Sequence, residues 1–241
     1  MSQRSIRAVM LLTVLAMIVS LMPACAQRAD GDTARLSGRV VLHTGARKSH
    51  RPAIVVWLTE IGKGYPTAAP APGHFQLVQK DRMFKPHLLV VPVGSVVSFP
   101  NDDPFFHNVF SLFNGRRFDL GLYEAGSSRE VKFSREGVSY IFCNIHPQMS
   151  AVVIALATPL YAVADSTGAF SINSVPPGNF DLHVWIEGTP QPDLDRLNRR
   201  VPIASGQSSN IVINASGAYR PVRNHLNLYG KPYPSVSRPP Y

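Results

Sequence analysis

The stretch "YIFCNIHPQM", residues 140–149, places a cysteine, a histidine and a methionine within seven residues. Cys143, His146 and Met149 follow a Cys-x2-His-x2-Met spacing, with the apolar run "GVSYIF" before the cysteine and "SAVVIAL" after the methionine. Short apolar runs rich in β-branched residues are typical of buried strands. We therefore predict two strands joined by a tight loop, with all three side chains on that loop.

The N-terminal segment has the layout of an export signal. Arg4 and Arg7 precede an uncharged, mostly apolar run from 8 to 24, which small and then polar residues follow. This is the pattern of a secretory signal, and it predicts that residues 1–26 are removed and that the product is periplasmic or secreted. No second apolar run is long enough to span a bilayer, so we expect no membrane span in the mature chain.

Cys25 leaves the cleavage site ambiguous. Ala24-Cys25-Ala26 fits an A-x-A cleavage site, and this favours a soluble product. Cys25 is alternatively a lipid-bearing cysteine, although Met22 and Pro23 before it fit that signal poorly. Either route takes the protein out of the cytoplasm.

Cys143 is then the one cysteine of the mature chain, because the sequence contains two in all. Exported proteins use cysteine mainly for disulfides, and a disulfide needs two. Taken alone, Cys143 is equally well explained as a small buried hydrophobe. Its spacing to His146 and Met149 makes a metal ligand the better interpretation.

Composition favours strands and argues against nucleic acid. Twenty-one prolines and 17 glycines among 241 residues indicate many short strands and turns. The net charge is +9, yet residues 68–157 contain eight basic and seven acidic side chains, while residues 217–241 contain four basic and no acidic ones. A nucleic-acid protein concentrates basic residues on its binding element, so we expect no nucleic-acid partner.

Further strand-like runs precede the cysteine and predict an antiparallel sandwich over residues 68–157. These runs are "HLLVVPVGSVVSF" (87–99), "FFHNVFSL" (105–112) and "REVKFS" (129–134). His107 lies 36 residues before Cys143, on a strand that can lie beside the loop. A thiolate, two imidazoles and a thioether are the ligand set of a trigonal copper electron-transfer site. A satisfied core histidine at His107 and simple packing at Met149 are the alternatives for each residue taken separately.

The two segments "VPVGSVVSFPNDDPFFHNVFSL" and "YIFCNIHPQMSAVVIAL" resemble the cupredoxins, the plastocyanin and amicyanin family of blue copper proteins. The resemblance covers about residues 73–157, and the short loop is closest to amicyanin. It implies one type 1 copper held by four ligands: His107, Cys143, His146 and Met149. It further implies that Asn108 ties the ligand loops together, that main-chain N–H groups point at the sulfur, and that His146 is the electron port.

The flanking segments resemble a carboxypeptidase regulatory-like β-sandwich. "LSGRVVL…RPAIVVWLTE" matches the first half of such a domain, and "YAVADSTGAFSINSVPPGNFDLHVWIEG…VPIASGQSSNIVINA" matches the second. We therefore expect an all-β chain in which a cupredoxin Greek-key sandwich, 68–157, is inserted in a smaller sandwich made of 34–62 and 158–216. Two sequential domains are the alternative. For residues 217–241 we expect an extended, basic tail rich in proline and tyrosine.

These expectations define a function. The chain would be an exported copper protein that passes single electrons between periplasmic redox proteins, such as a c-type cytochrome or a dehydrogenase. It would not be an enzyme, because it lacks the His-x-His pairs that mark a second copper centre. The alternative function is a copper-carrying or accessory envelope protein.

Overall fold

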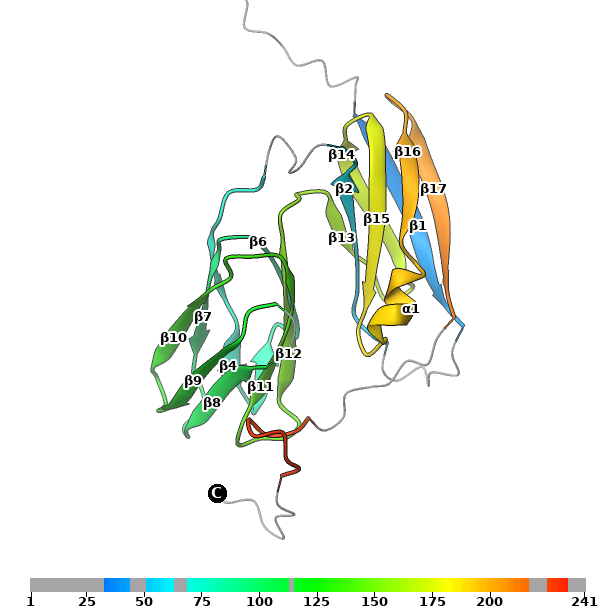
Figure 1. Ribbon diagram of the computed structural model, residues 1–241. Coiled ribbons are helices and arrows are strands. Elements are labelled where there is room, and N and C mark those ends of the chain that lie inside the picture. Colours follow the sequence, from blue (N-terminus) through cyan, green and yellow to red (C-terminus); the bar gives the residue numbers. More distant parts are fainter. Residues whose placement is uncertain (1–32, 44–50, 63–68, 113–114, 217–224, 234–241) are drawn as a thin grey trace, which may run out of the picture. The chain divides into compact units, whose positions relative to one another are not determined.

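The fold is all-β, as the sequence predicts, and is seen in a computed structural model (Figure 1). The structure describes residues 33–43, 51–62, 69–112, 115–216 and 225–233. Within these ranges the chain forms seventeen strands and one five-residue helix, α1 (Gln191–Asp195). The expected signal segment 1–26, with Cys25, lies outside the described residues. None of the described helical residues forms a helix with the length and apolarity needed to cross a membrane.

Two sheets are built from strands at the two ends of the described chain. One has the strand order β14-β1-β17 and the other has the order β13-β2-β15-β16. Their bounds are β1 Ala34–Leu42, β2 Ile54–Glu60, β13 Tyr161–Val163, β14 Ala169–Val175, β15 Gly178–Ile186, β16 Arg199–Ile203 and β17 Ser208–Ala215.

The pairing of these strands joins segments far apart in the sequence. Val40 of β1 lies opposite Ile213, and Val56 of β2 lies between Ala162 and Val184. The two N-terminal strands therefore share their sheets with strands that follow residue 160, and not with the strands between residues 74 and 156.

The intervening strands form two further sheets and a hairpin. The sheets have the orders β10-β7-β3 and β6-β12-β11-β8-β9, and β4 pairs with β5. Their bounds are β3 His74–Gln76, β4 Val78–Lys80, β5 Met83–Lys85, β6 Leu88–Pro92, β7 Val96–Pro100, β8 His107–Ser111, β9 Phe118–Tyr123, β10 Ser128–Lys132, β11 Gly137–Cys143 and β12 Ser150–Leu156.

Strand β12 is apolar on both faces because both faces are buried. Its residues 151, 153 and 155 pack in one cluster with Cys143 and Met149. Its residues 152, 154 and 156 pack in a second cluster with residues of the β14-β1-β17 sheet and the β13-β2-β15-β16 sheet. A strand covered on both sides has a continuous hydrophobic sequence instead of an alternating one. This explains the run "AVVIAL" soon after residues 143–149, which carry three of the candidate ligands and are called the ligand loop.

The structure differs from the sequence prediction in two places. The strands β3, β4, β5 and β9 were not predicted. Strands β3, β4 and β5 have three residues each, which leaves no periodic pattern, and Asp119 and Gly121, residue types that are depleted in strands, interrupt the six-residue β9. The tail was predicted to be extended, whereas its described part, residues 225–233, contains a turn and packs against the ligand loop. The rest of the tail lies outside the described residues.

Candidate metal centre

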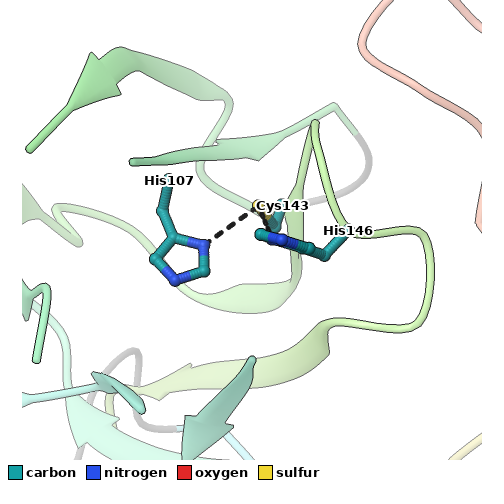
Figure 2. Close-up of side chains that lie close together, drawn as sticks. All are labelled: His107, Cys143 and His146. Atoms are coloured by element: carbon teal, nitrogen blue, oxygen red, sulfur yellow. Dashed lines mark hydrogen bonds between the residues drawn. The ribbon is translucent and has the colours of Figure 1, made fainter. Parts of the chain in front are cut away.

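Three potential ligands meet at one end of the five-stranded sheet. His107 is the first residue of β8 and Cys143 is the last residue of β11, and these strands pair through Cys143 and Val109. His146 comes from the loop that follows β11. Figure 2 shows the two imidazole rings on either side of the cysteine sulfur. The structure therefore brings together residues that lie 36 positions apart in the sequence.

The donor atoms are spaced as one metal ion requires. Cys143 Sγ lies 3.5 Å from His107 Nδ1 and 3.6 Å from His146 Nδ1 (Figure 2). For bond lengths of about 2.0 Å to nitrogen and 2.3 Å to sulfur, a nitrogen and a sulfur that share one ion lie roughly 3.5–3.7 Å apart. Ligand atoms of the three residues all lie within 4.8 Å of one another. The residues thus fit a metal ion without rearrangement.

The ligand loop is closed by its own main chain. The N–H of Cys143 donates to the carbonyl of Met149 at 3.2 Å, and the N–H of Met149 donates to the carbonyl of His146 at 3.0 Å. The Met149 side chain is 1% exposed and packs in the same cluster as Cys143. The tight loop therefore places the thioether residue in the core beside the cysteine, and the imidazole residue at the rim.

Asn108 joins the two ligand-bearing segments through its main chain. Its carbonyl accepts a hydrogen bond of 3.0 Å from the N–H of Asn144, the residue after the cysteine. Its side-chain amide instead donates to Asp119 at 2.8 Å. The contact between the segments therefore depends on the strand geometry of β8 rather than on the amide side chain.

Asp103 is a site residue that the sequence analysis missed. Its Oδ2 lies 2.9 Å from His107 Nε2, and both side chains are almost completely buried. Because a carboxylate only accepts, the proton of the imidazole sits on Nε2, and the lone pair of Nδ1 faces the sulfur. The available signal was the acidic pair in "PNDDP", one member of which precedes the histidine by four residues.

Hydrogen bonds keep Asp103 ionised in spite of its burial. Burial acts to raise the pKa of this carboxyl, but hydrogen bonds from the N–H of Arg82, from His107 and from the N–H of Asp81 outweigh it. The net pKa of Asp103 is lowered. A negative charge is therefore fixed behind the first histidine.

The pKa values of the two histidines suit metal binding near neutral pH, whereas that of the cysteine is shifted the other way. Burial, followed by the charges of His107 and Arg82, lowers the pKa of His146 to about 4. Burial also lowers the pKa of His107, so both imidazoles are neutral. Burial raises the pKa of the Cys143 thiol, and main-chain hydrogen bonds to the sulfur oppose that shift. These bonds come from Asn108, Ile145 and His146.

Aromatic and basic side chains surround the two histidines. The Phe105 ring lies 5.3 Å from the His107 ring and 5.6 Å from the His146 ring, and the Arg82 guanidinium lies 5.1 Å above the same phenylalanine. Phe106 is 55% exposed. The half-buried His146 therefore lies beside the partly buried Phe105 ring, while His107 and Cys143 are fully enclosed.

Fold and site together define an all-β protein with a preformed Cys-His-His group, suited to one soft or borderline metal ion. Solved structures similar to part of the chain are copper proteins of the cupredoxin type. A purple cupredoxin from Nitrosopumilus maritimus is 26% identical, covering 35% of this chain and 99% of that one, with a TM-score of 0.31. A reduced amicyanin variant is 18% identical, covering 42% of this chain and 99% of its own, with a TM-score of 0.32.

A third similar structure belongs to an enzyme. The copper-containing nitrite reductase from Thermus scotoductus is 20% identical, with a TM-score of 0.34. The aligned part is 49% of this chain but 28% of the reductase chain. A scan against models of known families found none that matches, and a search of curated proteins also found no match.

Proposed function

We propose that this chain is an exported one-copper protein of the cupredoxin type that transfers single electrons between redox partners. The observation that carries this proposal is the spacing of 3.5 and 3.6 Å between Cys143 Sγ and the Nδ1 atoms of His107 and His146. Copper bound by these residues and Met149 would supply one-electron chemistry between Cu(II) and Cu(I).

The residues of the site suit both oxidation states. The sulfur ligands of Cys143 and Met149 favour Cu(I), whereas imidazole tolerates Cu(I) and Cu(II). The buried strands β8 and β11, together with the hydrogen-bonded loop, hold the donors at fixed positions. A fixed ligand frame keeps the structural change on electron transfer small. His146 is half-buried at the rim, beside the Phe105 ring, which supports its role as the electron port.

The proposed partners are periplasmic redox proteins, such as a c-type cytochrome or a dehydrogenase. A carrier passes its electron onward and does not turn over a substrate itself. The similarity to part of a nitrite reductase makes nitrite the substrate to test against this view. Measurable nitrite consumption by the copper-loaded protein and an electron donor would contradict the carrier role.

We also propose that the electron-transfer domain, residues 68–157, interrupts a host sandwich formed by residues 34–62 and 158–216. The pairing of β1 with β14 and β17, and of β2 with β13 and β15, supports this division. Under this proposal both N-terminal strands fold only together with strands beyond residue 160. The host sandwich then holds the copper domain at both of its chain ends.

Copper loading of the purified mature protein tests the proposed function. Addition of one equivalent of Cu(II) should give an intense visible band and the narrow copper hyperfine splitting of a copper–thiolate site. The variant Cys143→Ser should bind copper weakly and stay colourless, because the thiolate gives rise to the band. A colourless wild-type protein with ordinary hyperfine splitting would refute the assignment.

A copper-delivery role is distinguished by how the metal is retained. His107 and Cys143 are 0% exposed, which favours slow release of the ion. We expect the protein to keep Cu(I) through repeated cycles of reduction and oxidation in the presence of a Cu(I) chelator. Rapid loss of Cu(I) to the chelator would favour the delivery role instead.

A further inference from the structure

The described part of the C-terminal tail lies against the ligand loop. We call residues 225–233 the C-terminal strap; Figure 1 shows it in red beside the connection from β11 to β12. The Tyr233 hydroxyl donates to the Cys143 carbonyl at 2.9 Å, and the N–H of Leu228 donates to Asn144 Oδ1 at 2.8 Å. The N–H of His225 donates to the Pro147 carbonyl at 3.4 Å. In each of these bonds the strap supplies the donor and the loop supplies the acceptor.

The strap has a defined conformation of its own. Asn227 Oδ1 accepts hydrogen bonds of 2.9 Å from the N–H groups of Tyr229 and Lys231. The N–H of Asn227 donates to the Lys231 carbonyl, also at 2.9 Å, which closes the turn. An asparagine that bonds the main chain two and four residues ahead stabilises a turn. Tyr233 is thereby presented to the loop from a folded segment.

His225 anchors the strap to the strand that carries the cysteine. Its side chain is buried, with 7% exposure, and its ring stacks on Phe142 with a centroid distance of 4.3 Å. The Tyr233 ring meets the same imidazole edge-on at 5.4 Å. Phe142 is the residue before Cys143, so the anchor and the hydroxyl contact act on adjacent residues of β11.

Tyr233 completes the main-chain hydrogen bonding of Cys143. The N–H of Cys143 is already held within the loop by the Met149 carbonyl, and its carbonyl is held by Tyr233. Burial raises the pKa of Tyr233, so the phenol keeps its proton and acts as the donor. Rotation of the Cys143 peptide would move the attached Sγ, and both bonds resist that rotation.

We propose that Tyr233 is a positioning residue of the metal centre, which sets the orientation of the Cys143 sulfur by holding the carbonyl of the same residue. This inference rests on the proposed copper function. The hydrogen bond from the hydroxyl also offsets the negative end of the carbonyl dipole of a ligand residue, which favours the reduced state. The C-terminal strap is then a part of the copper site, and its Tyr233 lies 90 positions from the cysteine in the sequence.

The test compares Tyr233→Phe with the matched control Tyr229→Phe in the full mature chain. Both variants keep an aromatic ring on the strap, and the Tyr229 side chain is 77% exposed. With copper bound, Tyr233→Phe should shift the visible sulfur-to-copper bands and lower the reduction potential, whereas Tyr229→Phe should match the wild type. A Tyr233→Phe protein with wild-type bands and wild-type potential would overturn the proposal.

A measurement on the metal-free protein separates this inference from the proposed function. Loss of the Tyr233 hydroxyl removes its hydrogen bond to the Cys143 carbonyl, so the ligand loop should open more often. A thiol reagent should therefore label Cys143 about three- to tenfold faster in Tyr233→Phe than in Tyr229→Phe. If the wild type gives no coloured copper site, the copper function fails, and the labelling rates alone decide whether Tyr233 holds Cys143. Equal labelling rates in the two variants would refute that contact.

Discussion

Asp103 and His107 form a buried pair in which the carboxylate Oδ2 lies 2.9 Å from the imidazole Nε2. The pair fixes the side of the ring that faces the cysteine sulfur, and it places a negative charge behind a candidate ligand. A carboxylate in this position raises the basicity of the histidine and favours the more positively charged, oxidised state of a bound metal. The centre is therefore shaped by a residue that does not touch the metal position.

The variant Asp103→Asn tests this relationship. Loss of the charge should raise the reduction potential of the copper site and weaken Cu(II) binding by about 10- to 100-fold. The control is Asp102→Asn, which removes the same charge from an exposed neighbour. Redox titration and competition with a Cu(II) chelator measure the two effects. Equal shifts in both variants would mean that only long-range charge matters.

Met149→Leu tests the thioether as a weak ligand. Leucine has a similar volume, so the buried site should lose less than about 1.5 kcal/mol of stability. Removal of the sulfur should raise the reduction potential while the visible band of the thiolate remains. Met83→Leu is the control, because Met83 is 51% exposed. A potential that is unchanged in Met149→Leu would remove this residue from the ligand set.

The sequence indicated which side chains lie together where chemistry and strand pattern coincide. Cys143, His146 and Met149 are close in the chain, so a tight loop between two apolar runs suffices to bring them together. His107 could be added because strands β8 and β11 are both visible as apolar runs, and it joins the cluster. The ligand role of all four residues stays a prediction until copper is bound.

Asp103 was missed although it lies four residues before His107, whereas Tyr233 could not be found from the pattern, because its role depends on a distant contact. A tyrosine in a proline-rich tail gives no sign that it will meet a carbonyl 90 residues earlier. His225 was likewise assigned no specific role, yet it is buried against Phe142. Short strands such as β3 and β4 were missed for a related reason, since their pairing partners and not their composition define them.

Gly168→Ala tests the contact between the two halves of the proposed host sandwich. Gly168 has a φ of +82°, and an added Cβ would lie 2.2 Å from the Val40 carbonyl oxygen. We expect a loss of about 1–3 kcal/mol in the free energy of unfolding, measured by urea denaturation. The control Gly62→Ala has a similar φ of +81° but no atom within 4 Å of the new Cβ. It should lose less, and equal losses would argue against the packing of Gly168 on β1.

His87→Gln tests the pH dependence of a hydrogen-bonded ion pair. His87 Nε2 lies 2.7 Å from Glu187 Oε1, and its Nδ1 lies 3.1 Å from the Ser150 carbonyl. The hydrogen bond and the charge of Glu187, aided by Ser150 and opposed by burial, raise the pKa of His87 above 6.5. The folded state thus favours protonated histidine, so the stabilisation is complete below pH 6.5 and is lost as pH rises through the raised pKa.

The difference in unfolding free energy between wild type and His87→Gln should therefore shrink as the pH rises above 6.5 and through the raised pKa of His87. Because the His87 side chain is 45% exposed, the change should be roughly 1 kcal/mol or less. Metal-free protein is used so that copper binding does not contribute. Subtracting the variant from the wild type also cancels the opposite slopes of histidines such as His183 and His225, whose pKa values are lowered by burial. A difference that stays constant or grows with pH would show that His87 is neutral in the folded protein.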